Sequence, residues 1–304
     1  MKAARYHVVH ETRYEYHQPV GLSRQVVRLA PRVIPWQLCR SHALRISPEA
    51  EILAVRADAF GNPVTSFAIE ADHASLAVRA ESWVDVSARV FPDDAATPPW
   101  EKVRARLAYR GGYRPLPADL DAARFLFEST RVRNKRELSA WTLASFPPGA
   151  PLLVGVRALM NRIHREFTFD PKATDVSTPV MEVFTRRRGV CQDFAPLMLS
   201  CLRSVGLAAR DVSGYLLTRP PPGRPRLIGA DASHAWVSAW VPGAGWVEVD
   251  PTNDKFIDDR YVILGWGRDY ADVPPLRGVI FTEGSGSRLT VSVDLVPAGS
   301  APLP

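Results

Sequence analysis

Short alternations of apolar and polar residues run through the first 90 residues of the chain. Residues 5–9 and 12–16 are rich in β-branched and aromatic side chains, a pattern typical of strands with one buried face. Turn-forming residues such as Pro19 and Gly21 separate these runs. Because the runs are short and evenly spaced, we predict an N-terminal β-sandwich domain over residues 1–90.

The alternation stops near residue 91. Prolines and glycines interrupt residues 91–150, and only short helical stretches fit between them. We therefore predict that this segment is a linker with short helices. From residue 153 to 167 the apolar residues recur at a helical period, which predicts the first long helix of a second domain.

The second domain, predicted over residues 151–304, combines helices with strands. One helix should begin near Gln192 or Asp193 and end before Gly206. Its continuous apolar stripe consists of Phe194, Leu197, Met198, Cys201, Leu202 and Val205. Strand-like runs follow it at residues 209–217, 234–241, 246–250, 279–281 and 289–296.

The composition is that of an ordinary globular protein. The chain has 304 residues, of which 46% are hydrophobic and 23% charged, and this length favours two domains. No apolar run approaches the roughly 20 residues of a membrane span, and the N-terminus lacks the apolar core of a secretory signal. The three cysteines are therefore expected to be reduced thiols. We expect a cytoplasmic protein that binds no membrane.

The net charge of +6 is spread along the chain. The basic residues form only two small clusters, at residues 131–136 and 186–188, without interleaved aromatic residues. We therefore expect no nucleic-acid partner. The positive charge leaves open the attraction of an acidic substrate.

Cys191 stands directly before the apolar stripe, so its sulfur is expected at a helix N-terminus. Unpaired backbone N–H groups and the helix dipole favour an anion there, and so favour a thiolate. A buried structural cysteine is the alternative interpretation of this position. Cys201 lies within the stripe and Cys39 lies near Trp36, so we expect both to be packing residues.

His234 opens one strand-like run and Asp250 closes the next, with a connector rich in glycine and proline between them. A hairpin with a three-residue loop at residues 241–243 places the two side chains directly opposite each other on one face. A four-residue loop at residues 242–245 places Asp250 opposite Val237, on the other face. A His–carboxylate pair is therefore sterically natural here, though the pattern does not force it.

These three residues fit nucleophilic catalysis. A thiolate attacks a carbonyl carbon, a histidine transfers the proton, and a carboxylate orients the imidazole. Zinc is the rival interpretation, because all three residue types bind it. A structural zinc site needs four ligands with close sequence spacing, which the chain does not show. We expect no metal and no other cofactor.

The segments around these residues resemble the transglutaminase-like core, and more closely the bacterial transglutaminase-like proteins with an N-terminal β-domain. The matching core segments are Gly189-Val190-Cys191-Gln192-Asp193-Phe194-Ala195, Gly206-Leu207-Ala208-Ala209-Arg210-Asp211-Val212-Ser213-Gly214-Tyr215, His234-Ala235-Trp236 and Asp250-Pro251-Thr252-Asn253. Residues 6–16 and Asp58-Ala59-Phe60-Gly61-Asn62-Pro63 resemble the N-terminal domain. The resemblance implies an α+β fold, in which a papain-like core carries the cysteine helix on an antiparallel sheet.

The resemblance also implies catalytic roles for Cys191 as nucleophile, His234 as general acid and base, and Asp250 as orienter. Phe169 stands where related proteins often carry tyrosine, so the backbone N–H of Cys191 is the first expected oxyanion donor. Gln192 is a candidate for the second donor and for substrate binding.

Trp236 is a further candidate for substrate binding, as a wall of the cleft, and packing against the helix is its alternative role. We expect a peptide or protein substrate and hydrolysis of its amide bond, as in a cysteine protease or amidase. Transfer of the acyl group to an amine and a non-catalytic binding module are the alternatives. The sequence does not specify an oligomeric state.

Overall fold

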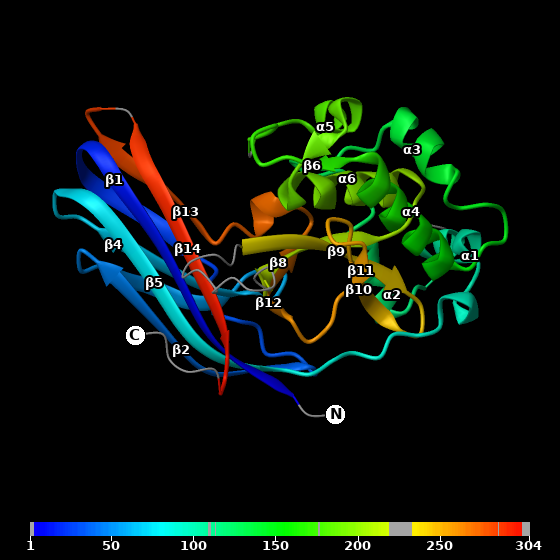
Figure 1. Cartoon of the computed structure of the whole chain (residues 1–304), viewed down its shortest axis with the longest axis horizontal. Helices are drawn as coiled ribbons and strands as arrows, with labels where there is room; N and C mark the ends of the chain where they lie inside the picture. Colours follow the sequence, from blue (N-terminus) through cyan, green and yellow to red (C-terminus); the bar gives the residue numbers. More distant parts are fainter. Residues whose placement is uncertain are drawn as a thin grey trace, which may run out of the picture.

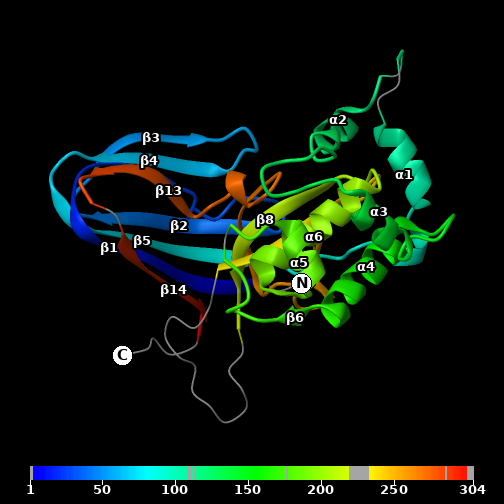
Figure 2. The same cartoon turned by 90° about the horizontal axis from the view of Figure 1, so that it is seen from above.

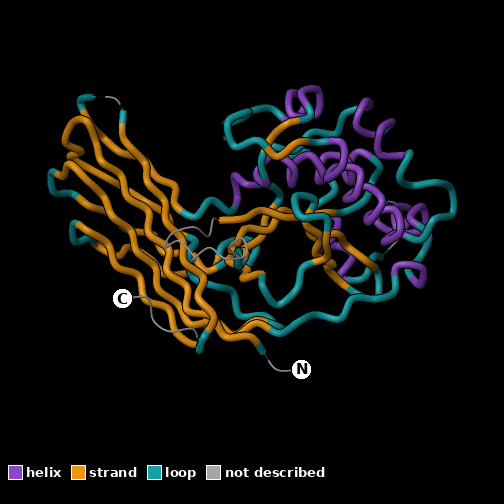
Figure 3. The backbone as a smooth tube through the Cα atoms, viewed as in Figure 1, coloured by secondary structure: helices purple, strands orange, loops and turns teal. Residues whose placement is uncertain are grey.

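The computed structural model describes residues 3–108, 111–112, 114–175, 177–218, 233–284 and 286–299. The chain forms a long curved antiparallel sheet and, beside it, a mixed part in which helices cover a smaller sheet (Figures 1 and 2). The helices gather in this second part (Figure 3). The α+β class and the order of a β-domain followed by a mixed domain are as predicted.

The long sheet contains seven antiparallel strands, which lie in four side-by-side rows. Its strands are β1 (Ala4–Val27), β2 (Gln37–Ser47), β3 (Glu51–Ala57), β4 (Pro63–Ile69), β5 (His73–Val86), β13 (Leu276–Thr282) and β14 (Ser287–Pro297). The first half of β1 pairs with β5 and β14, and its second half pairs with β4 and β13. Strand β2 continues the sheet beside β5, and β3 continues it beside β4. Three of the rows thus consist of two strands placed end to end, whereas β1 alone forms the fourth.

A bend inside β1 explains why the N-terminal domain is one curved sheet and not two stacked sheets. Pro19 and Gly21 lie inside β1, where the pairing with β5 shifts register between Glu15 and Val20. A proline and a register shift bend a strand without reversing the chain. The residues that the sequence presents as turn signals therefore curve the sheet into a half-barrel.

The two C-terminal strands belong to this first sheet. Residues 276–297 were predicted with the second domain, but β13 and β14 pair with β1, for example at Val8↔Leu295. The alternating residues Val293 and Leu295 are buried on the inner face, beside Val8. The chain therefore ends by completing the domain with which it begins.

The mixed part begins with a series of helices. They are η1 (Asp94–Ala96), α1 (Trp100–Leu107), α2 (Pro117–Ala123), α3 (Arg136–Leu143), α4 (Leu152–Glu166), α5 (Val180–Arg186) and α6 (Cys191–Ser204), with the parallel pair β6 (Thr168–Phe169) and β7 (Arg188–Gly189). The segment predicted as a linker is an integral part of this layer, because Trp100, Phe125 and Leu138 are buried in the same core as α4 and α6.

Helix α6 is the centre of the mixed part. It packs on the second sheet, whose order is β11-β10-β9-β8-β12, and against α3, α4 and α5. The strands of this sheet are β8 (Ala209–Leu216), β9 (Ser233–Val241), β10 (Gly245–Asp250), β11 (Lys255–Phe256) and β12 (Tyr261–Gly267), and η2 (Tyr270–Asp272) follows them. Almost every residue of α6 is buried, so its N-terminal residue has a fixed position against the sheet.

The two parts are joined along β12. The side chain of Asn62 accepts from the Trp266 N–H at 2.9 Å and donates to the Trp266 carbonyl at 2.8 Å. Gln37 makes the same two-way contact with Ile263, at 2.7 Å in each direction. The turn at residues 58–63 is therefore an anchor between the domains. No helix within the described ranges has the length and apolar composition needed to cross a membrane.

Candidate active site

Cys191 is the first residue of α6, one residue before the predicted start. The Asp193 carboxylate accepts from the Val190 N–H at 2.8 Å and from the Thr174 hydroxyl at 2.6 Å, which fixes the entry to the helix. A Cβ on Gly189 would lie 2.6 Å from Asp193 Oδ2, so glycine is required for this approach. The geometry places the Cys191 sulfur at the end of the helix where backbone N–H groups have no internal acceptor.

His234 and Asp250 come from neighbouring strands, in a register that differs from the predicted one. The β9–β10 loop has three residues, but it is 242–244, so Val249 pairs with Val237 and Asp250 falls level with Trp236. His234 is two positions further along β9 and therefore faces the same side of the sheet. Its Nε2 lies 2.7 Å from Asp250 Oδ2.

Asp250 is fully buried and hydrogen-bonded at both oxygens. Its Oδ2 accepts from the Tyr261 hydroxyl at 2.8 Å and the Asn253 side chain at 2.7 Å, while Oδ1 accepts from the N–H groups of Thr252 and Asn253. Burial alone raises the pKa of Asp250, but its bonds with His234, Asn253 and Tyr261 outweigh burial and lower it. Asp250 is therefore held as a carboxylate facing the imidazole.

Cys191 lies close enough to His234 to contribute to the raised pKa of its ring. Because Nε2 contacts Asp250, Nδ1 is the ring nitrogen left for the sulfur. Burial lowers the pKa of His234, but the interactions with Asp250 and Cys191 more than offset this and raise the pKa to about 10. Cys191 and His234 are each 9% exposed, so the pair lies just beneath the surface. The structure thus brings the three sequence-predicted residues together.

The other two candidate residues occupy different environments. Gln192, the residue after Cys191, is partly exposed and lines a hollow at the start of α6. Trp236 is 0% exposed, and its ring packs edge-on against Tyr261 with centroids 5.3 Å apart. The prediction that Trp236 contacts substrate is therefore corrected: its strand turns the indole into a small core beneath His234, where it packs with Val212 and Ile263.

We expect Trp236→Ala to destabilise the fold by about 3–5 kcal/mol, because it leaves a large cavity under His234. Trp83→Ala is the matched control, since Trp83 is a tryptophan on the exposed face of β5, and its loss should cost less than about 1 kcal/mol. Chemical denaturation of both variants measures the difference. Equal stability of the two variants would show that Trp236 does not support the sheet.

Two groups at the site lacked any sequence signal. Tyr261 opens β12, at the edge of the sheet beyond β8, and only the folded sheet brings its hydroxyl to Asp250. Tyr270 lies in the turn after β12 and lines the same hollow as Gln192. Phe169 is 55% exposed and carries no donor. Among the described residues, no group of three or more His, Cys, Asp or Glu side chains is placed to hold a metal ion.

A helix that carries cysteine at its N-terminus, packed on an antiparallel sheet that carries histidine and aspartate, is the papain-like arrangement. Two family models match the chain: the bacterial transglutaminase-like N-terminal region over residues 6–85, and the transglutaminase-like superfamily over residues 148–251. The chain belongs to the bacterial transglutaminase-like proteins, as its sequence predicts.

The chain is also similar to individual proteins. An uncharacterized protein of Mycobacterium tuberculosis is 41% identical over 300 residues, which cover 96% of this chain and 93% of that protein. A protein-glutamine gamma-glutamyltransferase of Pseudomonas aeruginosa is 38% identical over 101 residues, 32% of this chain and 15% of that protein. The crystal structure of a candidate cysteine protease from Cytophaga hutchinsonii shares the fold, with a TM-score of 0.75, 18% identity, and coverage of 100% of this chain and 94% of that one.

Proposed function

We propose that this protein is a thiol-dependent acyl-transfer enzyme that cleaves amide bonds through a thioester on Cys191. The observation that carries the proposal is the contact chain from Cys191 to His234 to Asp250, at the N-terminus of a buried helix. Each member has the partner that its role requires: the sulfur has an imidazole, and the imidazole has a buried carboxylate.

In the first step the Cys191 sulfur attacks the carbonyl carbon of the amide and forms a tetrahedral intermediate. With its pKa raised to about 10, His234 is an imidazolium at neutral pH and can protonate the leaving nitrogen. The C–N bond then breaks, the amine departs, and the acyl group is left as a thioester. The N–H of Cys191, without an acceptor inside the helix, is the donor for the oxyanion.

In the second step a nucleophile attacks the thioester, His234 takes up its proton, and the C–S bond breaks. We favour water as this nucleophile, which makes the enzyme a peptidase or amidase. The likeness to a protein-glutamine gamma-glutamyltransferase over 101 residues supports the second candidate, transfer to an amine.

The products distinguish these two candidates. A panel of peptides with internal amide bonds and glutamine side chains is incubated with the enzyme, with and without a primary amine, and analysed by mass spectrometry. Hydrolysis yields a free acid in both conditions, whereas transfer yields an amide that contains the added amine. Cys191→Ala is the control that removes contaminating activities. Amine-containing products as the main species would overturn the proposal of hydrolysis.

We expect the thiol of Cys191 to be the one that reacts. Burial raises the pKa of Cys39, and it raises the pKa of the fully buried Cys201 to about 12, so both are poor nucleophiles near neutral pH. Iodoacetamide at pH 7 should therefore alkylate Cys191 at least about tenfold faster than either one, as measured by peptide mass spectrometry. Equal labelling of the three cysteines, or no labelling of Cys191, would instead favour a non-catalytic binding module.

A further inference from the structure

A hollow of about 400 Å³ lies over β1 in the second half of the long sheet. Its volume is within the range of sites that bind small molecules. Arg24, Val26 and Arg28 line it and share one face of β1, because they alternate with Val27, which is buried in the core on the other face. The hollow is therefore on the outer face of the sheet, and no residue of the candidate triad lines it.

The strand registers place three arginines around one valine. Arg24 and Arg28 lie on either side of Val26 along β1. In the neighbouring strands, Arg277 of β13 and Ser66 of β4 are directly opposite Val26. Residues opposite each other on neighbouring strands share a face, so three arginine side chains and a hydroxyl surround Val26.

Apolar side chains complete the lining of the hollow. Val279 lies opposite Arg24 on β13, and Leu53 reaches the hollow from β3; both are exposed. A Cβ on Gly278 would overlap the carbonyl oxygen of Arg24, so only glycine allows β13 to approach β1 this closely. The hollow thus combines cationic and apolar walls on strands whose spacing is fixed.

The donors of the three arginines are largely available. Arg24 has no hydrogen bond or ion pair with any described residue. Arg28 donates from Nε to Asp58 at 3.4 Å, and Arg277 donates one N–H to the Ala271 carbonyl at 3.4 Å, both near the upper limit for a hydrogen bond. The other N–H groups of these guanidiniums have no acceptor among the described residues and can bind a ligand.

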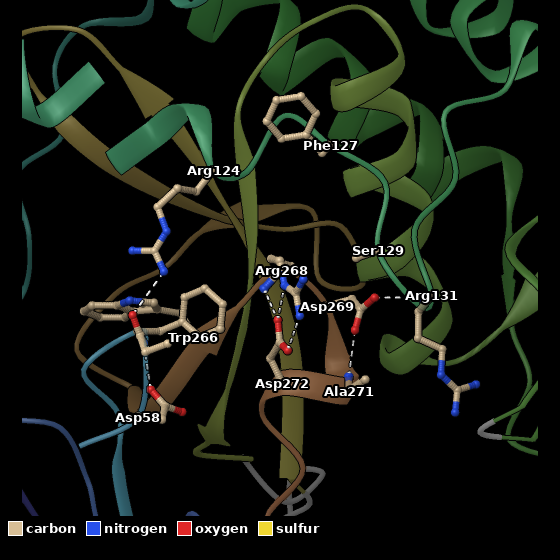
Figure 4. A network of polar contacts seen from close by, with 12 residues as sticks. Asp58, Arg124, Phe127, Ser129, Arg131, Trp266, Arg268, Asp269, Ala271 and Asp272 are labelled. Atoms are coloured by element: carbon tan, nitrogen blue, oxygen red, sulfur yellow. Dashed lines mark hydrogen bonds and ion pairs between the residues drawn. The ribbon is translucent and has the colours of Figure 1, made fainter. Parts of the chain in front are cut away.

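The acidic residues near the hollow lie outside its lining. Among the described residues that line it, none is Asp or Glu. Asp272 is nearby, but its carboxylate accepts two hydrogen bonds from the Arg268 guanidinium (Figure 4). Glu51 shares a face with Arg24, but β4 separates the two residues. The hollow is therefore a positively charged site.

We propose that this hollow binds a phosphate monoester whose organic group is apolar. Asp58 offsets one of the three positive charges, and the remaining charge of about +2 matches the dianion of a phosphate monoester near neutral pH. The phosphate oxygens accept from the guanidiniums and from the Ser66 hydroxyl, while the organic group packs on Val26 and Leu53. A soluble ester and the head group of phosphatidic acid both provide this chemistry. The site goes beyond the proposed acyl transfer and does not depend on it.

Phenyl phosphate is the probe for this site, with binding measured by isothermal titration calorimetry at fixed ionic strength. Inorganic phosphate lacks the apolar group, and benzoate lacks the second charge. Phenyl phosphate should bind once per chain, with a Kd at least about fivefold below those of the other two anions. Arg24→Gln should raise this Kd about fivefold or more, and it should fold normally because the side chain has no partner among the described residues.

Arg13→Gln is the matched control. Arg13 is an exposed arginine of the same strand, pairs with Glu11 and lies outside the hollow, so its loss should leave the Kd within about twofold. Leu53→Ser should reduce the advantage of phenyl phosphate over inorganic phosphate and leave the binding of inorganic phosphate unchanged. The absence of saturable binding, an equal loss in both arginine variants, or equally tight binding of benzoate would overturn the proposal.

Vesicles distinguish the two sources of the phosphate. Phosphatidylcholine vesicles with and without phosphatidic acid are sedimented with the protein, and phenyl phosphate is added as a competitor. Binding that requires phosphatidic acid, falls in Arg24→Gln and is displaced by phenyl phosphate supports a lipid head group. Binding of phenyl phosphate without sedimentation supports a soluble ester. Sedimentation that falls equally in Arg13→Gln and Arg24→Gln would show attraction by net charge alone and would contradict a specific site.

Discussion

Cys191→Ala should abolish turnover, by a factor of about 10⁴ or more, while the protein keeps its fold. The substitution removes the atom that forms the thioester, and no other described cysteine can replace it: Cys201 is fully buried, and Cys39 lies on β2 in the other domain. Alanine is well tolerated at the first position of a helix, so the loss of stability should be small. Product formation and thermal unfolding of the same preparation measure both effects.

Cys201→Ala is the matched control for this prediction. Its thiol packs in the core under α6, so its removal should cost about 1 kcal/mol of stability or somewhat more, and should leave the chemistry intact. The two variants should therefore have opposite phenotypes. Cys191→Ala loses turnover and keeps its stability, whereas Cys201→Ala keeps turnover and loses stability. Turnover that survives in Cys191→Ala but is lost in Cys201→Ala would show that the assignment of Cys191 as the nucleophile is wrong.

His234→Ala should reduce turnover by about 10³ or more, because no group is then placed to protonate the leaving nitrogen. The members of a triad act as a unit, so Cys191→Ala combined with His234→Ala should be no slower than Cys191→Ala alone. His7→Ala is the control, since His7 lies on β1 and pairs with Glu81. A multiplicative loss in the double variant would show that Cys191 and His234 act in separate steps.

The raised pKa of His234 also makes stability depend on pH. The folded value of about 10 lies above the unfolded value of about 6.5, so the protonated ring stabilises the fold fully below pH 6.5, and this contribution is lost as the pH rises through 10. The difference in unfolding free energy between wild type and His234→Ala should therefore shrink between pH 6.5 and 10. A difference that stays constant over this range would show that the ring is neutral in the folded protein.

The sequence predicts the three candidate catalytic residues because each stands at the start or the end of a predicted helix or strand. Cys191 precedes an apolar stripe, and His234 and Asp250 bound two strands joined by a short connector. The exact hairpin register was wrong by one loop position, yet the shared face survived, because any three-residue loop places these two residues on the same side. The prediction depended on the loop having an odd number of residues, which the connector suggested, and not on the residue at which the loop begins.

Other features could not be predicted, because they depend on contacts between distant segments. Nothing local tells whether Pro19 bends a strand or ends it; the answer comes from β5, β13 and β14, which pair on both sides of β1. In the same way, Arg131 and Ala271 are separated by more than a hundred residues in the chain, and Asp269 links their loops by accepting from both backbone N–H groups. Periodicity identifies strands and helices, but it carries no information about which loops lie together.

The central claim, a thioester on Cys191, can be tested directly by trapping the intermediate. The enzyme is mixed with an amide peptide that it turns over, quenched in acid within the first turnover, digested, and analysed by mass spectrometry. We expect the peptide containing Cys191 to carry the mass of the acyl group, with the amine product released in equal amount, and no adduct in Cys191→Ala. Full product formation with Cys191 unmodified at every quench time would contradict the mechanism.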